Sequence, residues 1–570
     1  MTITKPWLSC YPAEVSATLE YPRVPLTYYL EKAVQDYPHK NALSFMGKRM
    51  TYQELLQYSY RFAHVLQANG IKKGDRVAIM LPNLPQTVIA FYGILFAGAV
   101  VVMTNPLYTE RELLHQLKDS GASAIVALDL LYKRVMSVKP ETEIKTIFAT
   151  GIKDFLPPLK KVIYPLVQKF DKKAIPVPEI AYTNEVVDFV GVVKEAKTDP
   201  VSVDGDWEND LAVLQYTGGT TGIAKGVMLT HRNLVANAIQ CDAIMYRIKK
   251  GEAKILGALP LFHVYGMTTV MNCGIQKAGE VILIPKFDAT MILKTIQKEQ
   301  PNLFPGAPTM YIGLINHPDI QKYDLCSIEA CVSGSAPLPL EVQERFEHIT
   351  GGKLVEGYGL TESSPVTHSN NLWEKRINGS IGIPWPDTDA CIMDAATGEQ
   401  LPVGQIGELA VKGPQIMKGY WNRPEDTAMV LRDGWLLTGD IAYQDEEGFF
   451  YIVDRKKDMI IAGGYNIYPR EVEEVLFEHV SIQEAAVIGV PDPYRGETVK
   501  AFVVMKEGHK MNEEELDQFC RTKLASYKVP RKYEFREELP KTMVGKVLRR
   551  QLQDEEKKRM ADEESTSKLG

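Results

Sequence analysis

The feature that most constrains the fold is an alternation of two hydrophobic periodicities from about residue 25 to 440. Amphipathic helical stretches such as TYQELLQYSYRFAHVLQANG (51–70) alternate with short β-rich runs such as RVAIML (76–81) and GAVVVMTN (98–105). Helices and strands in regular alternation pack as layers around a mainly parallel sheet. The sequence therefore predicts an α/β fold with a large N-terminal domain of layered sheets and helices.

The pattern changes after GEQLPVGQIGELAV (398–411), where short strands are separated by glycines. Beyond DRKKD (454–458) the order becomes strand, helix, strand, strand, helix, strand, carried by MIIAGG, PREVEEVLFEH, QEAAVIGV, TVKAFVVMK, MNEEELDQFCRTKL and YEFRE. This order predicts a small α+β domain. We expect domains over 1–456 and 457–552, followed by a highly charged, disordered tail over 553–570.

Charge and cysteine usage restrict the class of protein. The net charge of −7 and the pI of about 5.9 argue against nucleic acid or an anionic membrane as the main partner. The seven cysteines are dispersed without a C-x-x-C pair, which is typical of buried thiols in a reducing compartment. The N-terminus lacks the apolar stretch of a signal peptide. These features predict a cytoplasmic location.

The longest uncharged apolar run, VIAFYGILFAGAVVVM (88–103), has 16 residues. It is shorter than the span of about 20 residues that a bilayer requires. Gly98 interrupts it and a β-branched run follows, which predicts a buried helix leading into a buried strand.

Residues 151–175 carry an apolar stripe at helical spacing with lysines opposite. The helix is expected to kink at Pro165. Two interpretations stay open: a surface element that packs its stripe on the body, which we favour, and an interfacial membrane contact. The stripe consists of Leu159, Val162, Ile163, Leu166, Val167 and Phe170, and the lysines are Lys160, Lys161 and Lys169.

The stretch YTGGTTGIAKG (216–226) combines glycines, threonines and a lysine, which gives a flexible backbone rich in phosphate donors. It does not fit the pattern G-x-x-x-x-G-K-[ST], because Ile223 and Ala224 stand where the second glycine is needed. Lys225 is followed by Gly226, so no hydroxyl is placed to hold Mg²⁺. The loop suits a polyphosphate, but the metal ligand must come from elsewhere.

Three further stretches follow this loop: EGYGLTESS (356–364), GWLLTGD (434–440) with YIVDRKKD (451–458), and PKTMVGKVLRR (540–550). In this order and at these separations, the four motifs resemble the adenylate-forming superfamily of acyl-CoA synthetases, luciferases and peptide-synthetase adenylation domains. The resemblance extends from about residue 25 to 552 and looks most like the bacterial long-chain fatty-acid–CoA ligases. Many relatives have serine at the position of Gly218 and proline at that of Ala224, and neither difference removes a needed donor.

The resemblance implies roles for individual residues. Glu362 would hold Mg²⁺, Thr361 would touch the α-phosphate, and Lys225 would add a cation at the phosphates. Tyr358 would stack on adenine, while Asp440 and Arg455 would hold the ribose and phosphate region. The remaining implied nucleotide contacts are Thr217, Gly218, Gly219, Thr220, Thr221, Gly222, Gly334, Ser335 and Ala336.

In relatives, the stretch PLFHVYG (260–266) borders the acyl carboxylate, which makes His263 a candidate catalytic residue. Lys546 resembles the catalytic lysine that bridges the carboxylate and the α-phosphate. Lys457 matches the hinge position of a mobile C-terminal domain, and Gly464 would let the pantetheine of coenzyme A approach. Taken singly, His263 is more often a packed core histidine, and Glu362 is more often a solvated carboxylate. Lys546 alone would be an exposed lysine in a basic run, Lys457 part of a charged loop, and 216–226 a glycine-rich turn.

The implied activity is ATP-dependent ligation of an acid to coenzyme A through an acyl-adenylate, with Mg²⁺ as cofactor. Acetate-using relatives have tryptophan at the position of Gly359, so glycine there predicts an open acyl pocket and a medium- to long-chain fatty acid. An aromatic acid of the coumarate type, or a shorter-chain acid, is the alternative. A homodimer and a peripheral membrane contact through 151–175 stay open.

Overall fold

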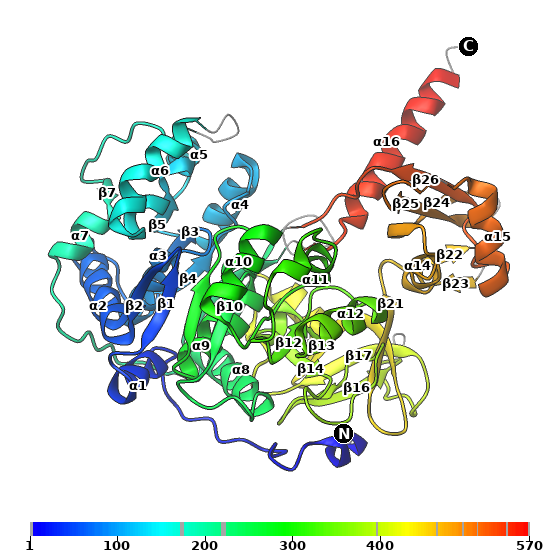
Figure 1. Ribbon diagram of the computed structural model, residues 1–570, viewed down its shortest axis with the longest axis horizontal. Helices are drawn as coiled ribbons and strands as arrows, with labels where there is room; N and C mark the ends of the chain where they lie inside the picture. Colours follow the sequence, from blue (N-terminus) through cyan, green and yellow to red (C-terminus); the bar gives the residue numbers. More distant parts are fainter. Residues whose placement is uncertain are drawn as a thin grey trace. The chain divides into compact units, whose positions relative to one another are not determined.

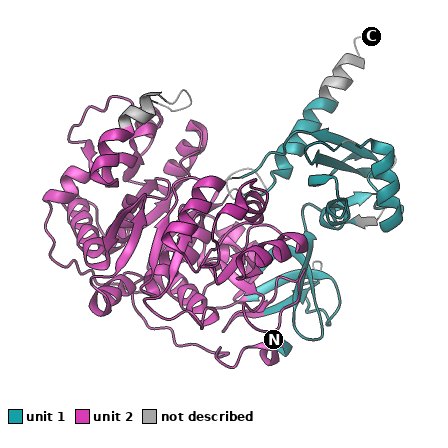
Figure 2. Ribbon diagram, in the orientation of Figure 1, with its two compact units in different colours: residues 1–6, 390–411, 437–570 teal, residues 7–389, 412–436 magenta. Residues whose placement is uncertain are grey.

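The computed structural model describes residues 4–170, 176–217, 224–394, 397–462, 465–492, 495–509, 511–542 and 545–567. The chain divides into two compact units (Figure 2). The first contains residues 1–6, 390–411 and 437–570, and the second contains residues 7–389 and 412–436. The domain boundary expected between residues 456 and 457 marks where a mobile C-terminal domain would begin, and it stays a prediction.

Within the described residues, the largest sheet of the second unit has eight strands (Figure 1). Its central strands are parallel and consist of Val-, Ile- and Ala-rich runs that are buried on both faces. In sheet order the strands are β18 (Gly419–Tyr420), β9 (Lys225–Thr230), β8 (Leu211–Thr217), β4 (Val100–Met103), β3 (Arg76–Met80), β5 (Ala124–Leu128), β6 (Thr146–Thr150) and β7 (Val186–Asp188).

Helices cover this sheet, as the alternating pattern predicts. Thr51 and Glu54 form a capping box at the start of α2 (Tyr52–Ala68). Every residue of α3 (Pro85–Phe96) is buried, and buried β4 follows, so the apolar run 88–103 is a buried helix and strand as expected. The other helices here are α1 (Tyr28–Asp36), α4 (Glu110–Ser120), α5 (Tyr132–Val138), α6 (Pro158–Phe170) and α7 (Phe189–Glu195).

Two smaller sheets complete the core of the second unit. One has the order β10 (Lys254–Gly257), β11 (Glu280–Leu283), β1 (Asn41–Phe45) and β2 (Lys48–Thr51). The other has the order β12 (Ala330–Ser333), β13 (Lys353–Gly359), β14 (Val366–Ser369) and β15 (Ile383–Pro384). Their helices are α8 (His231–Ile244), α9 (Cys273–Gln276), α10 (Ala289–Glu299), α11 (Pro308–Ile315) and α12 (Leu340–Thr350), and α13 (Pro424–Val430) follows β18.

The first unit contains the C-terminal α+β fold that the sequence predicts. Its sheet has the order β23 (Tyr465–Ile467), β22 (Ile460–Ala462), β25 (Gly496–Met505) and β24 (Ile482–Asp492), and β26 (Lys532–Arg536) pairs with β25. Helices α14 (Pro469–Phe477) and α15 (Glu513–Lys523) contribute to the core on one face. A further sheet carries β16 (Asp389–Met393), β17 (Gly407–Lys412), β19 (Leu431–Arg432), β20 (Trp435–Gln444) and β21 (Phe450–Arg455). The predicted α/β fold with a small α+β domain is confirmed.

Of the segment predicted to be disordered, residues 568–570 lie outside the described residues, and residues 553–567 lie in helix α16, which extends from Arg549 to Ser567. Its sequence is rich in Glu, Lys, Arg and Gln, which are good helix formers, and its first turns dock on the C-terminal sheet. Leu552 is fully buried there and Glu556 is only 4% exposed. Charged composition alone therefore does not indicate disorder when one position in each of two successive turns is buried.

Helix α6 forms where the stripe at 151–175 predicts a helix, but its described apolar side chains are not packed. Leu159 and Val162 are 73% and 72% exposed, and Ile163 is also exposed. The interpretation that this part of the stripe packs on the body is therefore wrong. The side chains of Pro165, Leu166, Val167, Lys169 and Phe170 lie outside the described residues.

Two further observations concern the location of the protein. No helix within the described residues is long and apolar enough to cross a membrane. Of the seven cysteines, Cys10 is partly exposed, Cys326 is exposed, and the other five are buried. The expectation of buried thiols thus holds for five of the seven.

Candidate active site

The candidate phosphate loop is held between two neighbouring strand ends. Strands β8 and β9 are antiparallel, and Thr217 at the end of β8 is the register partner of Lys225 at the start of β9. The connection between these two strands consists of residues 218–224. Gly218, Gly219, Thr220, Thr221 and Gly222 belong to this connection and lie outside the described residues.

Lys225 lies beside two residues of the 419–430 segment. Its Nζ is 2.9 Å from Oδ1 of Asp426 and 5.1 Å from the centre of the Tyr420 ring. Lys225 therefore lies between a carboxylate and the face of an aromatic ring.

Glu362 is in contact with the same tyrosine. It lies in the 3₁₀ turn Thr361–Ser363, directly after β13, and its Oε1 accepts a 2.7 Å hydrogen bond from the Tyr420 hydroxyl. Burial and the nearby Glu362 raise the pKa of Tyr420, so this hydroxyl stays protonated and donates. Lys225, Glu362 and Asp426 are therefore gathered around one aromatic ring.

The segment around Tyr420 is itself fixed by backbone hydrogen bonds. The Met417 amide donates to the Glu362 carbonyl at 2.8 Å, and the Trp421 amide donates to the Gly226 carbonyl at 2.7 Å. Tyr420 and Asp426 were missed by the sequence reasoning. Nothing in KGYWN (418–422) marks Tyr420 as functional before the pairing of β18 with β9 is known.

Three stretches meet at the candidate adenine and carboxylate region. The Tyr265 hydroxyl donates to the Val332 carbonyl at 2.7 Å, and the Gly334 amide donates to the Gly306 carbonyl at 3.0 Å. A Cβ on Gly334 would lie 3.0 Å from the Tyr265 ring, so glycine allows this close approach. Three stretches that are far apart in the sequence thus form one cluster: PLFHVYG (260–266), FPGAPTMY (304–311) and SGSAPLP (333–339).

His263 lies in this cluster and is partly exposed, between the buried residues Phe262 and Val264. Its Nδ1 accepts a 3.3 Å hydrogen bond from the Tyr265 amide. Ser335 has a positive φ of 73°, and Ala336 follows it at the start of the predicted adenine loop. Tyr358 is partly exposed on β13, where it is the register partner of His368 of β14. The centres of the two rings are 5.9 Å apart.

Gly359 has a different role from the one expected. It pairs with Val366 across β13 and β14 at a register shift, and the Leu360 amide donates to the Pro365 carbonyl at 3.1 Å. A Cβ at Gly359 would overlap that carbonyl oxygen. Glycine is therefore required for the close approach of these strands, and its absence of a side chain is no evidence for an open acyl pocket.

Asp440 and Arg455, both in the first unit, are brought together as predicted. Strands β20 and β21 are antiparallel, and their register pairs Asp440 with Arg455. The Nε of Arg455 is 3.5 Å from Oδ1 of Asp440, which is buried. The separation of 15 residues in the sequence is thus the length of one β-hairpin.

Lys546 lies in a tight hairpin that leads into α16. The Thr542 amide donates to the Lys546 carbonyl at 2.8 Å, and the Lys546 amide donates to the Thr542 hydroxyl at 3.1 Å. Burial, followed by the nearby Arg455, lowers the pKa of Lys546 to about 7, while Asp440 opposes this shift. The interpretation of Lys546 as an ordinary exposed lysine is therefore wrong.

The proposed hinge is also charged and partly enclosed. Burial lowers the pKa of Lys457, with Asp458 acting against it. Asp454, just before Arg455, has its pKa raised to about 6 by burial, although Arg549 opposes the shift. Gly464 lies outside the described residues.

The part of the chain that the structure describes contains no group of three or more His, Cys, Asp or Glu side chains able to hold a metal ion. Glu362 offers a single carboxylate. That donor set fits Mg²⁺ bound mainly by substrate phosphates, because Mg²⁺ commonly takes one or two protein carboxylates and completes its shell with phosphates and water. It does not fit a metal caged by protein ligands.

Comparisons with known proteins agree with this arrangement. The family described as AMP-binding enzyme matches residues 30–421, and the AMP-binding enzyme C-terminal domain matches residues 471–546. A long-chain-fatty-acid–CoA ligase of Bacillus subtilis (strain 168) is 56% identical over 98% of this chain and 99% of that protein. One from Escherichia coli O6:H1 is 43% identical over 97% of this chain and 98% of that protein.

Among solved structures, an anthranilate CoA ligase in complex with anthranoyl-AMP is similar to the fold with a TM-score of 0.83 and 25% identity. The similarity covers 97% of this chain and 99% of that one. The resemblance drawn from the four motifs is confirmed. Because the family match spans residues 30–421 and these relatives align over nearly their whole length, the chain belongs to the family of AMP-binding enzymes.

Proposed function

We propose that this protein ligates a medium- to long-chain fatty acid to coenzyme A at the expense of ATP. In the first half-reaction a carboxylate oxygen attacks the α-phosphorus of ATP, giving acyl-AMP and pyrophosphate. In the second, the thiol sulfur of coenzyme A attacks the acyl carbon, giving the thioester, AMP and a proton. The observation that carries this proposal is the nearly full-length identity to two long-chain-fatty-acid–CoA ligases.

The phosphate end of ATP is assigned to Thr217, the loop 218–222 and Lys225. Glu362 would hold Mg²⁺ against the phosphates, and the ion would offset their charge when bound. The hydrogen bond from Tyr420 supports this role, because it orients one Glu362 oxygen and leaves the other for the metal. Thr361 is assigned to the α-phosphate.

The nucleoside end is assigned to Tyr358 and the loop Gly334–Ser335–Ala336 for adenine, and to Asp440 and Arg455 for the ribose. An arginine beside a buried carboxylate supports the last assignment, since the carboxylate oxygens can accept hydrogen bonds from the ribose hydroxyls. His263 is assigned to the acyl carboxylate. Its partly exposed ring among buried neighbours supports contact with a substrate.

Lys546 is assigned to the bridge between the attacking carboxylate and the α-phosphate. A positioned ammonium at such a centre typically contributes about 10²–10³ in rate. For thioester formation, the C-terminal domain turns about Lys457, removes Lys546 and brings in the stretch around Gly464 for the pantetheine. The cytoplasm remains the predicted location.

An aromatic acid is the second candidate substrate, favoured by the similarity to the anthranilate CoA ligase. Incubation with ATP, Mg²⁺, coenzyme A and acids from C2 to C18, together with coumarate, tests both. We expect AMP, pyrophosphate and acyl-CoA in equal amounts, with kcat/KM rising from C2 toward C12–C18, since each buried methylene contributes about 0.8 kcal/mol. A preference for coumarate, or for acids below C6, would overturn the fatty-acid assignment.

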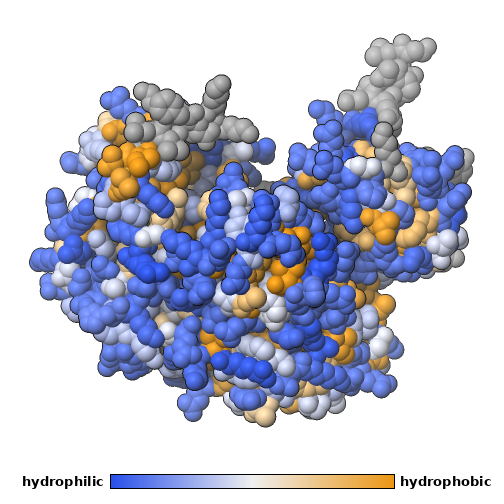
Figure 3. Space-filling model, in the orientation of Figure 1, coloured by the Kyte–Doolittle hydropathy of each residue, from blue (hydrophilic) through white to orange (hydrophobic). Residues whose placement is uncertain are grey.

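A peripheral membrane contact through 151–175 is part of the proposal. Leu159, Val162 and Ile163 are exposed on helix α6, and Figure 3 shows a patch of apolar surface at the upper left, beside the grey residues. Lysines surround it: Lys160 Nζ donates to the Met46 carbonyl at 2.8 Å, and Lys161 and Lys194 contribute, after burial, to lowering the pKa of Lys48. Apolar side chains with flanking cations suit an anionic lipid surface.

Co-sedimentation with phosphatidylglycerol vesicles tests this contact. The substitution of Val162 and Ile163 by aspartate should abolish binding while the adenylation of a soluble short acid is kept. Val480, which is 74% exposed in the C-terminal domain, provides the matched control when it is replaced by aspartate. Equal binding of all proteins, or none by the wild type, would overturn the contact.

A further inference from the structure

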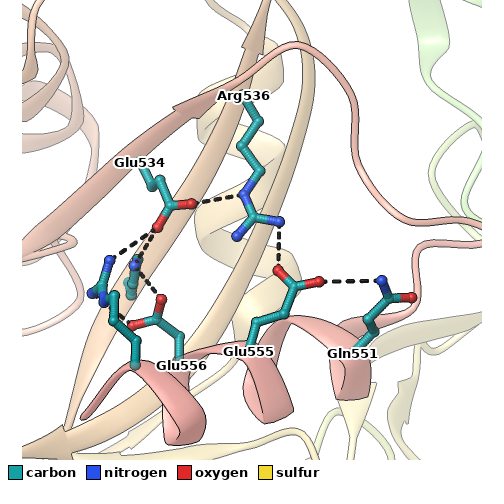
Figure 4. Close-up of polar contacts among 7 residues, drawn as sticks. Glu534, Arg536, Gln551, Glu555 and Glu556 are labelled. Atoms are coloured by element: carbon teal, nitrogen blue, oxygen red, sulfur yellow. Dashed lines mark hydrogen bonds and ion pairs between the residues drawn. The ribbon is translucent and has the colours of Figure 1, made fainter. Parts of the chain in front are cut away.

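A buried ion cluster lies between the C-terminal sheet and helix α16 (Figure 4). Lys500 of β25 is 2% exposed, and its Nζ is 2.6 Å from Glu534 of β26 and 2.7 Å from Glu556 of α16. Arg536 and Arg559 surround the carboxylates: Arg536 bonds Glu534 at 2.7 Å, and Arg559 bonds Glu556 at 2.9 Å. The cluster has no part in the chemistry described above.

The position of Lys500 makes the cluster unusual. Along β25, Val499, Ala501 and Val503 face the core with α14 and α15, while Phe502 and Val504 face α16. Side chains alternate between the faces of a strand, so Lys500 occupies a position on the apolar face under α16. Burying a charge at this position costs free energy unless the charge is paired. The best-supported role of buried polar and ionic groups is to select one arrangement of the packed elements.

What α16 holds in place is the hairpin of Lys546. The helix begins at Arg549, three residues after Lys546, and three residues reach about 10 Å at most. Within the hairpin, the Leu548 amide donates to the Pro540 carbonyl at 2.8 Å. Val547 packs against the same apolar cluster as Leu552 of α16 and Leu539 before the hairpin. A displacement of α16 therefore moves the backbone that carries Lys546.

A second anchor lies at the start of the helix. Arg549 Nη2 bonds Glu473 of α14 at 2.5 Å, and its Nη1 bonds Asp458 at 3.3 Å. Arg549 fixes the first residue of α16 but leaves the direction of its axis open. Glu556, two turns further along, determines that direction through Lys500.

We propose that Lys500, Glu534 and Glu556 are positioning residues for the adenylation half-reaction, because they dock α16 and so fix the hairpin that presents Lys546. The inference rests on the proposed function, since it gives Lys546 its task in adenylation. It does not require these three residues to touch any substrate.

The test compares the wild type with Lys500→Met, Glu556→Gln and the double variant Lys500→Met/Glu556→Met. Asp554→Asn is the matched control, because Asp554 is an exposed acid on the same helix and pairs with Arg550 at 3.7 Å. Single-turnover formation of palmitoyl-AMP is measured separately from thioester formation with palmitoyl-AMP supplied. Hydrogen exchange of amides 545–548 is followed in the same proteins without substrate.

We expect each single variant to lower the adenylation rate about tenfold or more with little change in the ATP KM, since misplacement by about 1 Å at a reacting centre can cost a hundredfold. Thioester formation from supplied palmitoyl-AMP should stay within about twofold. The double variant should recover most of the adenylation rate, because an apolar pair can replace a buried ion pair. Hairpin exchange should rise in the single variants only, and Asp554→Asn should match the wild type.

Equal losses in both half-reactions, or adenylation that is unchanged in the single variants, would overturn the inference. Failure of the proposed function is seen separately, because the wild type would then form no palmitoyl-AMP at all. The hydrogen-exchange comparison still decides in that case whether the cluster fixes the hairpin, and unchanged exchange in Lys500→Met would overturn the positioning role.

Discussion

Raising the pH above about 7 should deprive the substrate-free enzyme of its catalytic charge at Lys546. Burial and the neighbouring Arg455 lower the pKa of this lysine from 10.5 to about 7, so its ammonium loses the proton in a range where an ordinary lysine keeps it. The attack of a carboxylate on the α-phosphate requires the charged form. The free enzyme should therefore become progressively less competent as the solution becomes alkaline.

The size of the effect follows from this lowered pKa. About half of Lys546 is protonated at pH 7, and the protonated fraction falls about tenfold for each further pH unit. Because kcat/KM reports the free enzyme, kcat/KM of adenylation should fall by about tenfold between pH 8 and pH 9. Bound ATP places negative charge near the ammonium and raises its pKa, so kcat should keep its value to higher pH.

The assay is pyrophosphate release without coenzyme A, measured from pH 6 to 9.5 at limiting and at saturating ATP. Lys546→Arg is the control, since arginine stays charged throughout this range. It should turn over more slowly, but without the decline in kcat/KM above pH 7. If the wild type keeps a constant kcat/KM to pH 9.5, or if Lys546→Arg shows the same decline, Lys546 is not the titrating group and the reasoning fails.

Four substitutions test other parts of the site. Lys546→Ala should abolish acyl-AMP formation yet keep thioester formation from supplied acyl-AMP, and equal losses in the two would refute its role. Lys457→Pro should do the reverse, because a rigid connector holds the adenylating arrangement, and normal turnover would remove Lys457 as the hinge. Tyr420→Phe should raise the Mg²⁺ concentration for half-maximal rate about tenfold or more, because the hydrogen bond that orients Glu362 is lost. An unchanged Mg²⁺ requirement would contradict the proposal that Tyr420 orients Glu362. Gly359→Ala should lower kcat/KM about equally for C2, C8 and C16 acids, since its Cβ would displace the Pro365 backbone, and a loss confined to long acids would restore the open-pocket interpretation.

The sequence predicts the layers and the C-terminal element order well, because both depend on local periodicity. The resemblance assigns Asp440 and Arg455 to one region of the site, whereas their pairing in a β-hairpin is seen only in the structure. The sequence also predicts that the run 88–103 is buried. The run is too short for a bilayer span, and its apolar composition does not suit an exposed helix.

The rest depends on contacts between distant segments. Tyr420 reaches Glu362 only because β18 pairs with β9, and a two-residue strand has no periodicity to recognise. Helix α16 appears as a polar tail because its partners, Lys500 and Glu534, lie on β25 and β26. The resemblance predicts an open acyl pocket from Gly359. In the structure, the close approach of the Pro365 carbonyl explains why this residue is glycine.

The central claim is that a carboxylate oxygen attacks the α-phosphorus of ATP. It is tested most directly with palmitate labelled with ¹⁸O in both carboxylate oxygens, in a single turnover with ATP, Mg²⁺ and coenzyme A. The account predicts AMP that carries one ¹⁸O, palmitoyl-CoA that keeps the other, and unlabelled pyrophosphate. Unlabelled AMP, or ¹⁸O in orthophosphate together with ADP, would contradict it.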